Sequence, residues 1–170
     1  IAFPGGRGQT DEYSTRMISE GTKRGFAVVA LDAFYKTGIK PGDKTKFPNA
    51  HQYALDLKAI LASDTRFDRA NLFYTGFSYG AGQVSKSVDI RADFKSTPWR
   101  AVAAAEPGCN IISEPVKVSF PILLIKGSKS HYYLEPCQYF ERLLRAAGIN
   151  VTLSVIEGAN HFFSTDGRIT

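Results

Sequence analysis

The sequence lacks any run of about eighteen apolar residues, so it offers no candidate transmembrane helix. It also lacks a basic stripe, because its 21 lysines and arginines are spread along the chain and the net charge is only +5. Nucleic-acid binding is therefore not expected. Cysteine is scarce, and the two that occur, Cys109 and Cys137, match no zinc or redox spacing. These shortages leave globular enzymes and binding proteins as the classes to consider.

What the chain does have is a regular alternation of strand-like and helix-like segments over 170 residues, enough for one domain with a sizeable core. Strands are expected at 1–3, 26–31, 72–75, 101–105, 121–126 and 151–156. Helices are expected over 11–24, after Asn49, from 81 to about 90, and over 136–147. This order predicts a single α/β domain, residues 1–170, with a mostly parallel sheet covered by helices on both faces. Functional residues should then follow the carboxyl ends of the strands.

Two details concern the second of these helices. Asn49 is expected to cap its N-terminus, and the spacing of Tyr53, Leu57, Ile60 and Leu61 predicts its inner face. His51 falls in the first turn, where a surface position is expected.

The most informative motif is Gly76-Phe77-Ser78-Tyr79-Gly80, which reads G-x-S-x-G. A strand-like segment precedes it and a helix-like segment follows it, as a nucleophile elbow requires. The two glycines avoid clashes across a tight turn that exposes the serine hydroxyl. The pattern fixes only three positions, so a chance match is the alternative. Its flanks favour a nucleophilic Ser78.

A serine nucleophile needs a base and oxyanion donors. His161 lies just past the last expected strand, where its loop can reach Ser78, and His131 is the alternative base. The expected oxyanion donors are the backbone N–H of Tyr79 and one from the glycine-rich stretch Gly5, Gly6 and Arg7. An ordinary strand-to-helix turn is the other interpretation of that stretch.

Together these residues resemble the dienelactone hydrolase-like family of α/β-hydrolases. The segments that carry the resemblance are Pro4–Gly8, Val28–Phe34, Gly76–Gly80, Ala101–Cys109, Ile122–Gly127, Glu135–Cys137 and Gly158–Phe162. The resemblance implies the α/β-hydrolase fold and, with Ser78 in place of the cysteine of the namesake enzymes, general esterase chemistry. It implies no metal and no organic cofactor.

The chain departs from the family pattern in further places. Its oxyanion loop opens with Pro4-Gly5 where His-Gly is usual. Ser130 stands where the family carries its acidic residue. The family also has strands before residue 1 and a helix after the histidine, so the chain is expected to be part of a longer domain.

The acid that orients the histidine must therefore come from elsewhere between Ser78 and His161. Glu106 is the first choice because it directly follows the strand at 101–105 and should emerge beside Ser78. Glu135 and Glu114 come next, and a serine–histidine dyad or a water at Ser130 stays open.

Cys109 and Cys137 each come shortly after a strand that should end at this same edge, so a disulfide between them is predicted. Two buried free thiols are the alternative. No compartment is predicted outright, but a bridge would favour an exported protein, periplasmic or secreted.

The sequence thus predicts a serine hydrolase that cleaves a small-molecule carboxylic ester or lactone through an acyl-enzyme on Ser78. Two alternatives remain: a non-catalytic binding protein of the same fold with a degenerate triad, and a peptidase of the same fold. Oligomeric state is not predicted.

Overall fold

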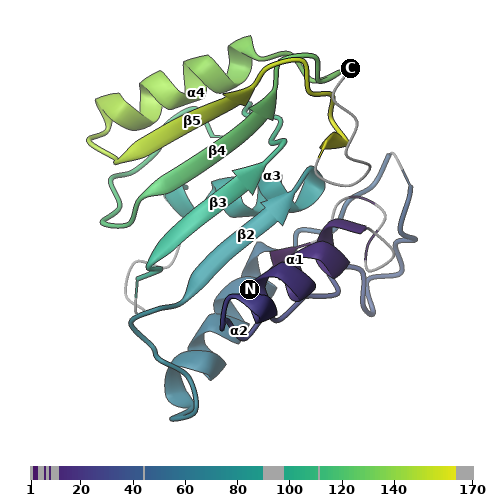
Figure 1. Cartoon of the computed structure of the whole chain (residues 1–170), viewed down its shortest axis with the longest axis vertical. Coiled ribbons are helices and arrows are strands. Elements are labelled where there is room, and N and C mark those ends of the chain that lie inside the picture. Colours follow the sequence, from purple (N-terminus) through teal and green to yellow (C-terminus); the bar gives the residue numbers. More distant parts are fainter. Residues whose placement is uncertain are drawn as a thin grey trace.

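The computed structural model describes residues 2–3, 6, 8, 12–43, 45–89, 98–110 and 112–163 (Figure 1). Its elements are, in chain order, β1 (Ala2–Phe3), α1 (Glu12–Lys23), α2 (His51–Ser63), β2 (Phe73–Phe77), α3 (Tyr79–Ser85), the 3₁₀ helix η2 (Lys86–Val88), β3 (Ala101–Ala105), β4 (Ile122–Gly127), α4 (Glu135–Ala146) and β5 (Val151–Ile156). The strands form one parallel sheet in the order β1-β2-β3-β4-β5. The predicted α/β class and parallel sheet are confirmed.

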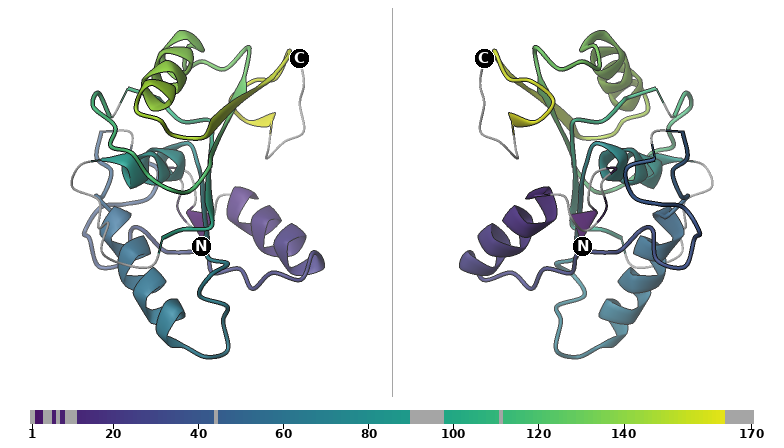
Figure 2. Two further views of the ribbon diagram at one scale, coloured as in Figure 1. Left: turned by 90° about the vertical axis from the view of Figure 1, so that its left-hand side faces the viewer. Right: turned by 90° about the vertical axis from the view of Figure 1, so that its right-hand side faces the viewer.

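Helices cover the two faces of the sheet unequally. Figure 2 shows α1 on one face and α2, α3 and α4 on the other. The larger core lies on the three-helix side, where alternate strand residues Tyr74, Val102 and Leu124 are buried. On the opposite side a smaller cluster joins Tyr13 of α1 to Phe77 and Ala105. The period-two alternation of the strands therefore sends apolar side chains into both layers.

The strand register aligns the positions where chemistry is expected. Phe77 pairs with Ala105, and Ala105 pairs with Ile125. The next residues along each strand are Ser78, Glu106 and Lys126. They therefore lie in one row at the carboxyl edge of the sheet.

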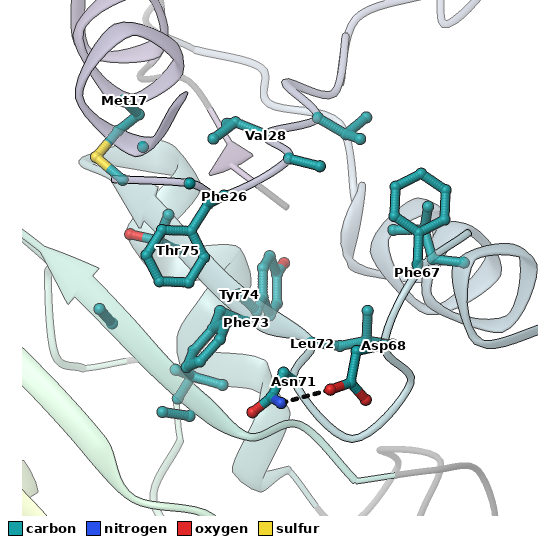
Figure 3. A pocket seen from close by; sticks show the side chains of 18 of the residues that line it. Met17, Phe26, Val28, Phe67, Asp68, Asn71, Leu72, Phe73, Tyr74 and Thr75 are labelled. Carbon is teal, nitrogen blue, oxygen red and sulfur yellow. Dashed lines mark hydrogen bonds between the residues drawn. The ribbon is translucent and has the colours of Figure 1, made fainter. Parts of the chain in front are cut away.

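The segment at 26–31 is not the strand that its apolar pattern predicts, since only Ala30 forms an isolated bridge. A strand needs a partner backbone, and within the described part of the chain β1 has two residues, which pair with Thr75 and Gly76 of β2. Instead, Phe26 and Val28 border an apolar groove of about 840 Å³ beside the amino-terminal half of β2 (Figure 3). The groove lies at the opposite end of β2 from Ser78.

Helix α2 differs from its prediction in capping and in orientation. Its N-cap is Ala50, with no side-chain cap, and the Oδ1 of Asn49 accepts a hydrogen bond from Lys86 instead. Its buried residues are His51, Ala54, Lys58 and Leu61, whereas Tyr53 and Ile60 are 38% and 61% exposed. The predicted inner face is thus correct for Leu61 and for Leu57, which packs partly buried against the core, and wrong for the other two residues. The expected surface position of His51 is also wrong, because His51 is buried.

The predicted disulfide is confirmed. Cys109 and Cys137 are bridged across 28 residues of sequence, with Cα atoms 4.8 Å apart. Cys109 follows β3 and Cys137 lies in the first turn of α4, so the bridge ties that helix to the carboxyl edge of the sheet.

Candidate active site

Ser78 lies in the one-residue turn between β2 and α3, with the positive φ of 52° that left-handed backbone has. A non-glycine residue rarely adopts such a φ. The turn is tight enough that a Cβ on Gly76 would lie 2.4 Å from the carbonyl carbon of Gly80. Position 76 therefore needs glycine where β2 meets the turn, and the serine is held at the carboxyl edge of the sheet.

His161 reaches Ser78 from the loop that follows β5. Its Nε2 lies 3.0 Å from Ser78 Oγ, and the side chain is 4% exposed. Gly127 at the end of β4 permits this approach, because a Cβ there would lie 2.3 Å from the carbonyl oxygen of Ala159. The structure thus brings His161, the first-choice base, onto Ser78.

Glu106 faces the other ring nitrogen of His161, with Oε2 3.0 Å from Nδ1. It is fully buried, and its own φ of 57° is also left-handed. Three more groups hydrogen-bond its carboxylate: Ser130 Oγ at 2.7 Å, Lys126 Nζ at 2.9 Å and the Gly127 N–H at 2.6 Å. The structure therefore joins Ser78, His161 and Glu106 in one series of hydrogen bonds.

These contacts determine the ionisation of Glu106. Burial alone would raise the pKa of the carboxyl, because it penalises the charged form. The hydrogen bonds from His161, Gly127, Lys126 and Ser130 outweigh burial and lower the pKa below its usual 4.5. Glu106 is therefore a carboxylate at neutral pH.

Sequence reasoning missed Lys126. Its side chain is fully buried and forms an ion pair with Glu106 at 2.9 Å, and Nζ also lies 3.1 Å from Ser130 Oγ. A lysine at the end of an otherwise apolar strand could have indicated this contact. Such a lysine is buried with the strand, and a buried charge almost always has a partner. Ser130, which stands where the family that the sequence resembles carries its acid, instead donates a hydrogen bond to Glu106.

The other predicted candidates lie elsewhere. Glu114 and Glu135 are exposed, in a loop and at the start of α4. His131, the alternative base, packs its ring on that of His161 with centroids 4.4 Å apart. Partial burial and then the charges of His161 and Lys126 lower the pKa of His131.

Of the expected oxyanion donors, Gly5 and Arg7 lie outside the described residues. Tyr79 opens α3, so its N–H has no partner from a preceding helical turn. Its side chain is fixed, because the hydroxyl donates to the Pro48 carbonyl at 2.7 Å and the ring stacks on Phe47. Gly6 packs against the same Phe47, where a Cβ would lie 2.9 Å from a ring carbon.

The described residues hold no group of three or more His, Cys, Asp or Glu side chains that could bind a metal ion. None of their helices is long and apolar enough to cross a membrane.

The sequence matches no protein-family model, and no curated protein matches it. Solved structures do match. A Klebsiella pneumoniae protein described as a "putative dienelactone hydrolase" is 18% identical, with a TM-score of 0.76 over 99% of this chain and 77% of that one. A thermophilic esterase from Thermogutta terrifontis is 17% identical, with a TM-score of 0.70 over 98% and 73%.

An acylaminoacyl peptidase from Pyrococcus horikoshii also matches, with 17% identity and a TM-score of 0.54 over 69% of this chain and 24% of that one. Structural matches at such low sequence identity show a shared fold but not a shared activity, and these matches include both esterases and a peptidase. With its parallel sheet, its helices on both faces and these structural matches, the chain has the α/β-hydrolase fold.

Proposed function

We propose that this chain is a serine hydrolase that cleaves carboxylic esters, lactones included, with Ser78 as nucleophile, His161 as general base and Glu106 as orienting acid. The observation that carries the proposal is the series of two 3.0 Å contacts, Ser78 Oγ to His161 Nε2 and His161 Nδ1 to Glu106 Oε2. A hydroxyl is a poor nucleophile at its free pKa, and an adjacent base removes that limitation.

In this mechanism His161 Nε2 takes the proton of Ser78 as Oγ attacks the ester carbonyl. The tetrahedral oxyanion accepts hydrogen bonds from the N–H of Tyr79 and from an N–H of the stretch Gly5, Gly6 and Arg7. His161 then protonates the leaving alcohol, and the acyl group stays on Ser78. Water, deprotonated by His161, releases the acid. Glu106 remains a carboxylate throughout and stabilises the imidazolium.

Substitution of Ser78 tests the proposal. A fluorophosphonate probe should label the wild type, and hydrolysis of p-nitrophenyl acetate should fall by at least about 10³-fold in Ser78→Ala. Ser63→Ala is the matched control, because Ser63 is exposed at the end of α2 and donates only to the Ile60 carbonyl. A wild type that neither reacts with the probe nor turns over esters would favour the non-catalytic binding protein instead.

A peptidase is tested with the same variants. Turnover of a p-nitroanilide peptide that exceeds turnover of simple esters and depends on Ser78 would reassign the substrate class while keeping the nucleophile. We expect esters to be the better substrates.

A further inference from the structure

The ring of His161 is enclosed by other rings. Phe77 lies beneath it, buried, with centroids 5.3 Å apart. His131, Tyr132 and Phe162 surround it at 4.4, 5.1 and 5.0 Å. These last three side chains are exposed, Tyr132 to 48% and Phe162 to 41%. We call His131, Tyr132 and Phe162 the outer rings.

The outer rings form one continuous surface. His131 contacts Tyr132 at 4.3 Å and Phe162 at 6.2 Å between centroids. Tyr132 is also supported from within, because the fully buried Lys126 places Nζ 5.5 Å from its ring centroid. Contiguous apolar surface that a folded protein leaves exposed next to reactive groups usually meets a ligand.

The chemistry determines which part of an ester would meet this surface. In the acyl-enzyme mechanism His161 Nε2 hands its proton to the oxygen of the departing alcohol, so that oxygen must lie within hydrogen-bond reach of this ring. A substituent on that oxygen that turns toward His161 would meet the outer rings. The acyl group is bonded to Ser78 and lies on the other side of the carbonyl.

We propose that the outer rings bind an aromatic ring in the alcohol part of the ester, so that the preferred substrates are esters of aromatic or aryl-methyl alcohols. The inference rests on the proposed function. Edge-to-face and offset contacts between rings favour an aromatic group over a saturated ring of the same size. The lowered pKa of His131 agrees with this, because a neutral imidazole presents an uncharged ring to the substrate.

The test compares benzyl acetate with cyclohexylmethyl acetate, which share the acyl group and differ in the character of the ring. Wild type should favour benzyl acetate about three- to tenfold in kcat/KM, the range expected of a good aromatic contact. The ratio should fall toward one in Tyr132→Leu and in Phe162→Leu. It should be unchanged in Tyr139→Leu, an exposed tyrosine on α4 whose ring contacts Arg142. Because both kcat/KM values are measured on the same enzyme preparation, their ratio does not depend on the fraction of protein that is folded.

A second substrate pair locates the ring. Methyl phenylacetate and methyl cyclohexylacetate carry the same two rings on the acyl side, and their ratio should not depend on Tyr132 or Phe162. The inference would be overturned if the ratio for the acyl pair, and not that for the alcohol pair, changed in Tyr132→Leu or Phe162→Leu. It would also be overturned if wild type hydrolysed benzyl and cyclohexylmethyl acetate equally well. Neither outcome would contradict hydrolysis through Ser78. Failure to hydrolyse any of the four esters would overturn the proposed function and this inference with it.

Discussion

At the scale of single residues, the pairing of Glu106 with Lys126 decides what a substitution in the site does. In Glu106→Gln, His161 loses the carboxylate that it faces, and kcat should fall by roughly 10³- to 10⁴-fold. Lys126, fully buried, loses its counter-charge, so the free energy of unfolding should fall by about 3–5 kcal/mol. Steady-state kinetics and urea unfolding measure the two effects separately.

The double variant Glu106→Gln, Lys126→Met separates the two roles. It removes both charges, and a well-packed apolar replacement for a buried ion pair is often neutral or stabilising. It should therefore regain stability without regaining activity. Recovery of kcat together with stability would show that Glu106 acts only as a structural partner of Lys126.

Lys126 should also affect the pH range of activity. Its hydrogen bond is one of those that lower the pKa of Glu106. Without it the carboxyl stays protonated to a higher pH, so in Lys126→Met the acid limb of kcat/KM should move to higher pH. Lys126→Arg, which keeps the charge, should move it less, and Lys117→Met at an exposed position should not move it. A limb that stays in place in Lys126→Met would contradict this role.

At the scale of the elements, the turn between β2 and α3 depends on its glycines. In Gly76→Ala the added Cβ would lie 2.4 Å from backbone atoms of Gly80, so the turn must open. We expect a loss of about 3 kcal/mol in the free energy of unfolding, with activity reduced because Ser78 moves. Gly108→Ala is the control, since its nearest neighbour is a side-chain oxygen at 3.3 Å. Equal urea midpoints for the two variants would argue against a tight turn.

The sheet was largely predictable, because buried parallel strands are short apolar runs between turn signals. The strands at 101–105 and 151–156 have the predicted bounds. The segment at 26–31 has the same kind of composition but pairs only through an isolated bridge at Ala30 in the described residues, and pairing is a tertiary property that composition does not reveal. In α2, Lys58 is buried over the ring of Trp99 at 4.8 Å, so a charged residue occupies the inner face.

Site residues could be predicted from the sequence where a motif or the end of a strand marks them. A contact that depends on how two strands are aligned could not be predicted. Ser78 and His161 come from motifs, and Glu106 from its place directly after a strand. Lys126 could not be paired with Glu106 from sequence alone, because the contact depends on the alignment of β3 with β4. The catalytic roles of Ser78 and Glu106 remain predictions that the variants above test, and the role of His161 as base also remains a prediction.

At the scale of the whole molecule, three helices lie on one face of the sheet and α1 lies on the other (Figure 2). On the α1 side Phe73 and Leu123 are 37% and 36% exposed, while their neighbours Tyr74 and Leu124 are fully buried. Stability therefore depends mainly on the three-helix layer. The disulfide reinforces that layer by joining α4 to the segment after β3. The expectation of an exported protein rests on this bridge and remains a prediction.

His51 belongs to this layer and should make the stability of the molecule depend on pH. Burial, followed by the charge of Lys86, lowers the pKa of His51 from 6.5 to about 4. A depressed pKa in the folded state means that the unfolded chain binds the proton first as pH falls. The stabilisation is therefore complete above pH 6.5 and is lost progressively as pH falls toward 4.

Between pH 7 and pH 5 this loss amounts to about 2 kcal/mol of unfolding free energy for His51. The pKa of Glu106 is lowered below 4.5, so the stabilisation that its charge provides is lost mainly below this window. Urea unfolding of the wild type and of His51→Gln at both pH values should show a pH effect smaller by about that amount in the variant. His131→Gln is the comparison: the pKa of this exposed imidazole is also lowered, but by less than that of His51, so His131→Gln should reduce the pH effect less than His51→Gln does. If His51→Gln and wild type lose the same free energy between pH 7 and pH 5, His51 is not buried as a neutral side chain, and the packing of α2 against Tyr74 must differ from the arrangement described.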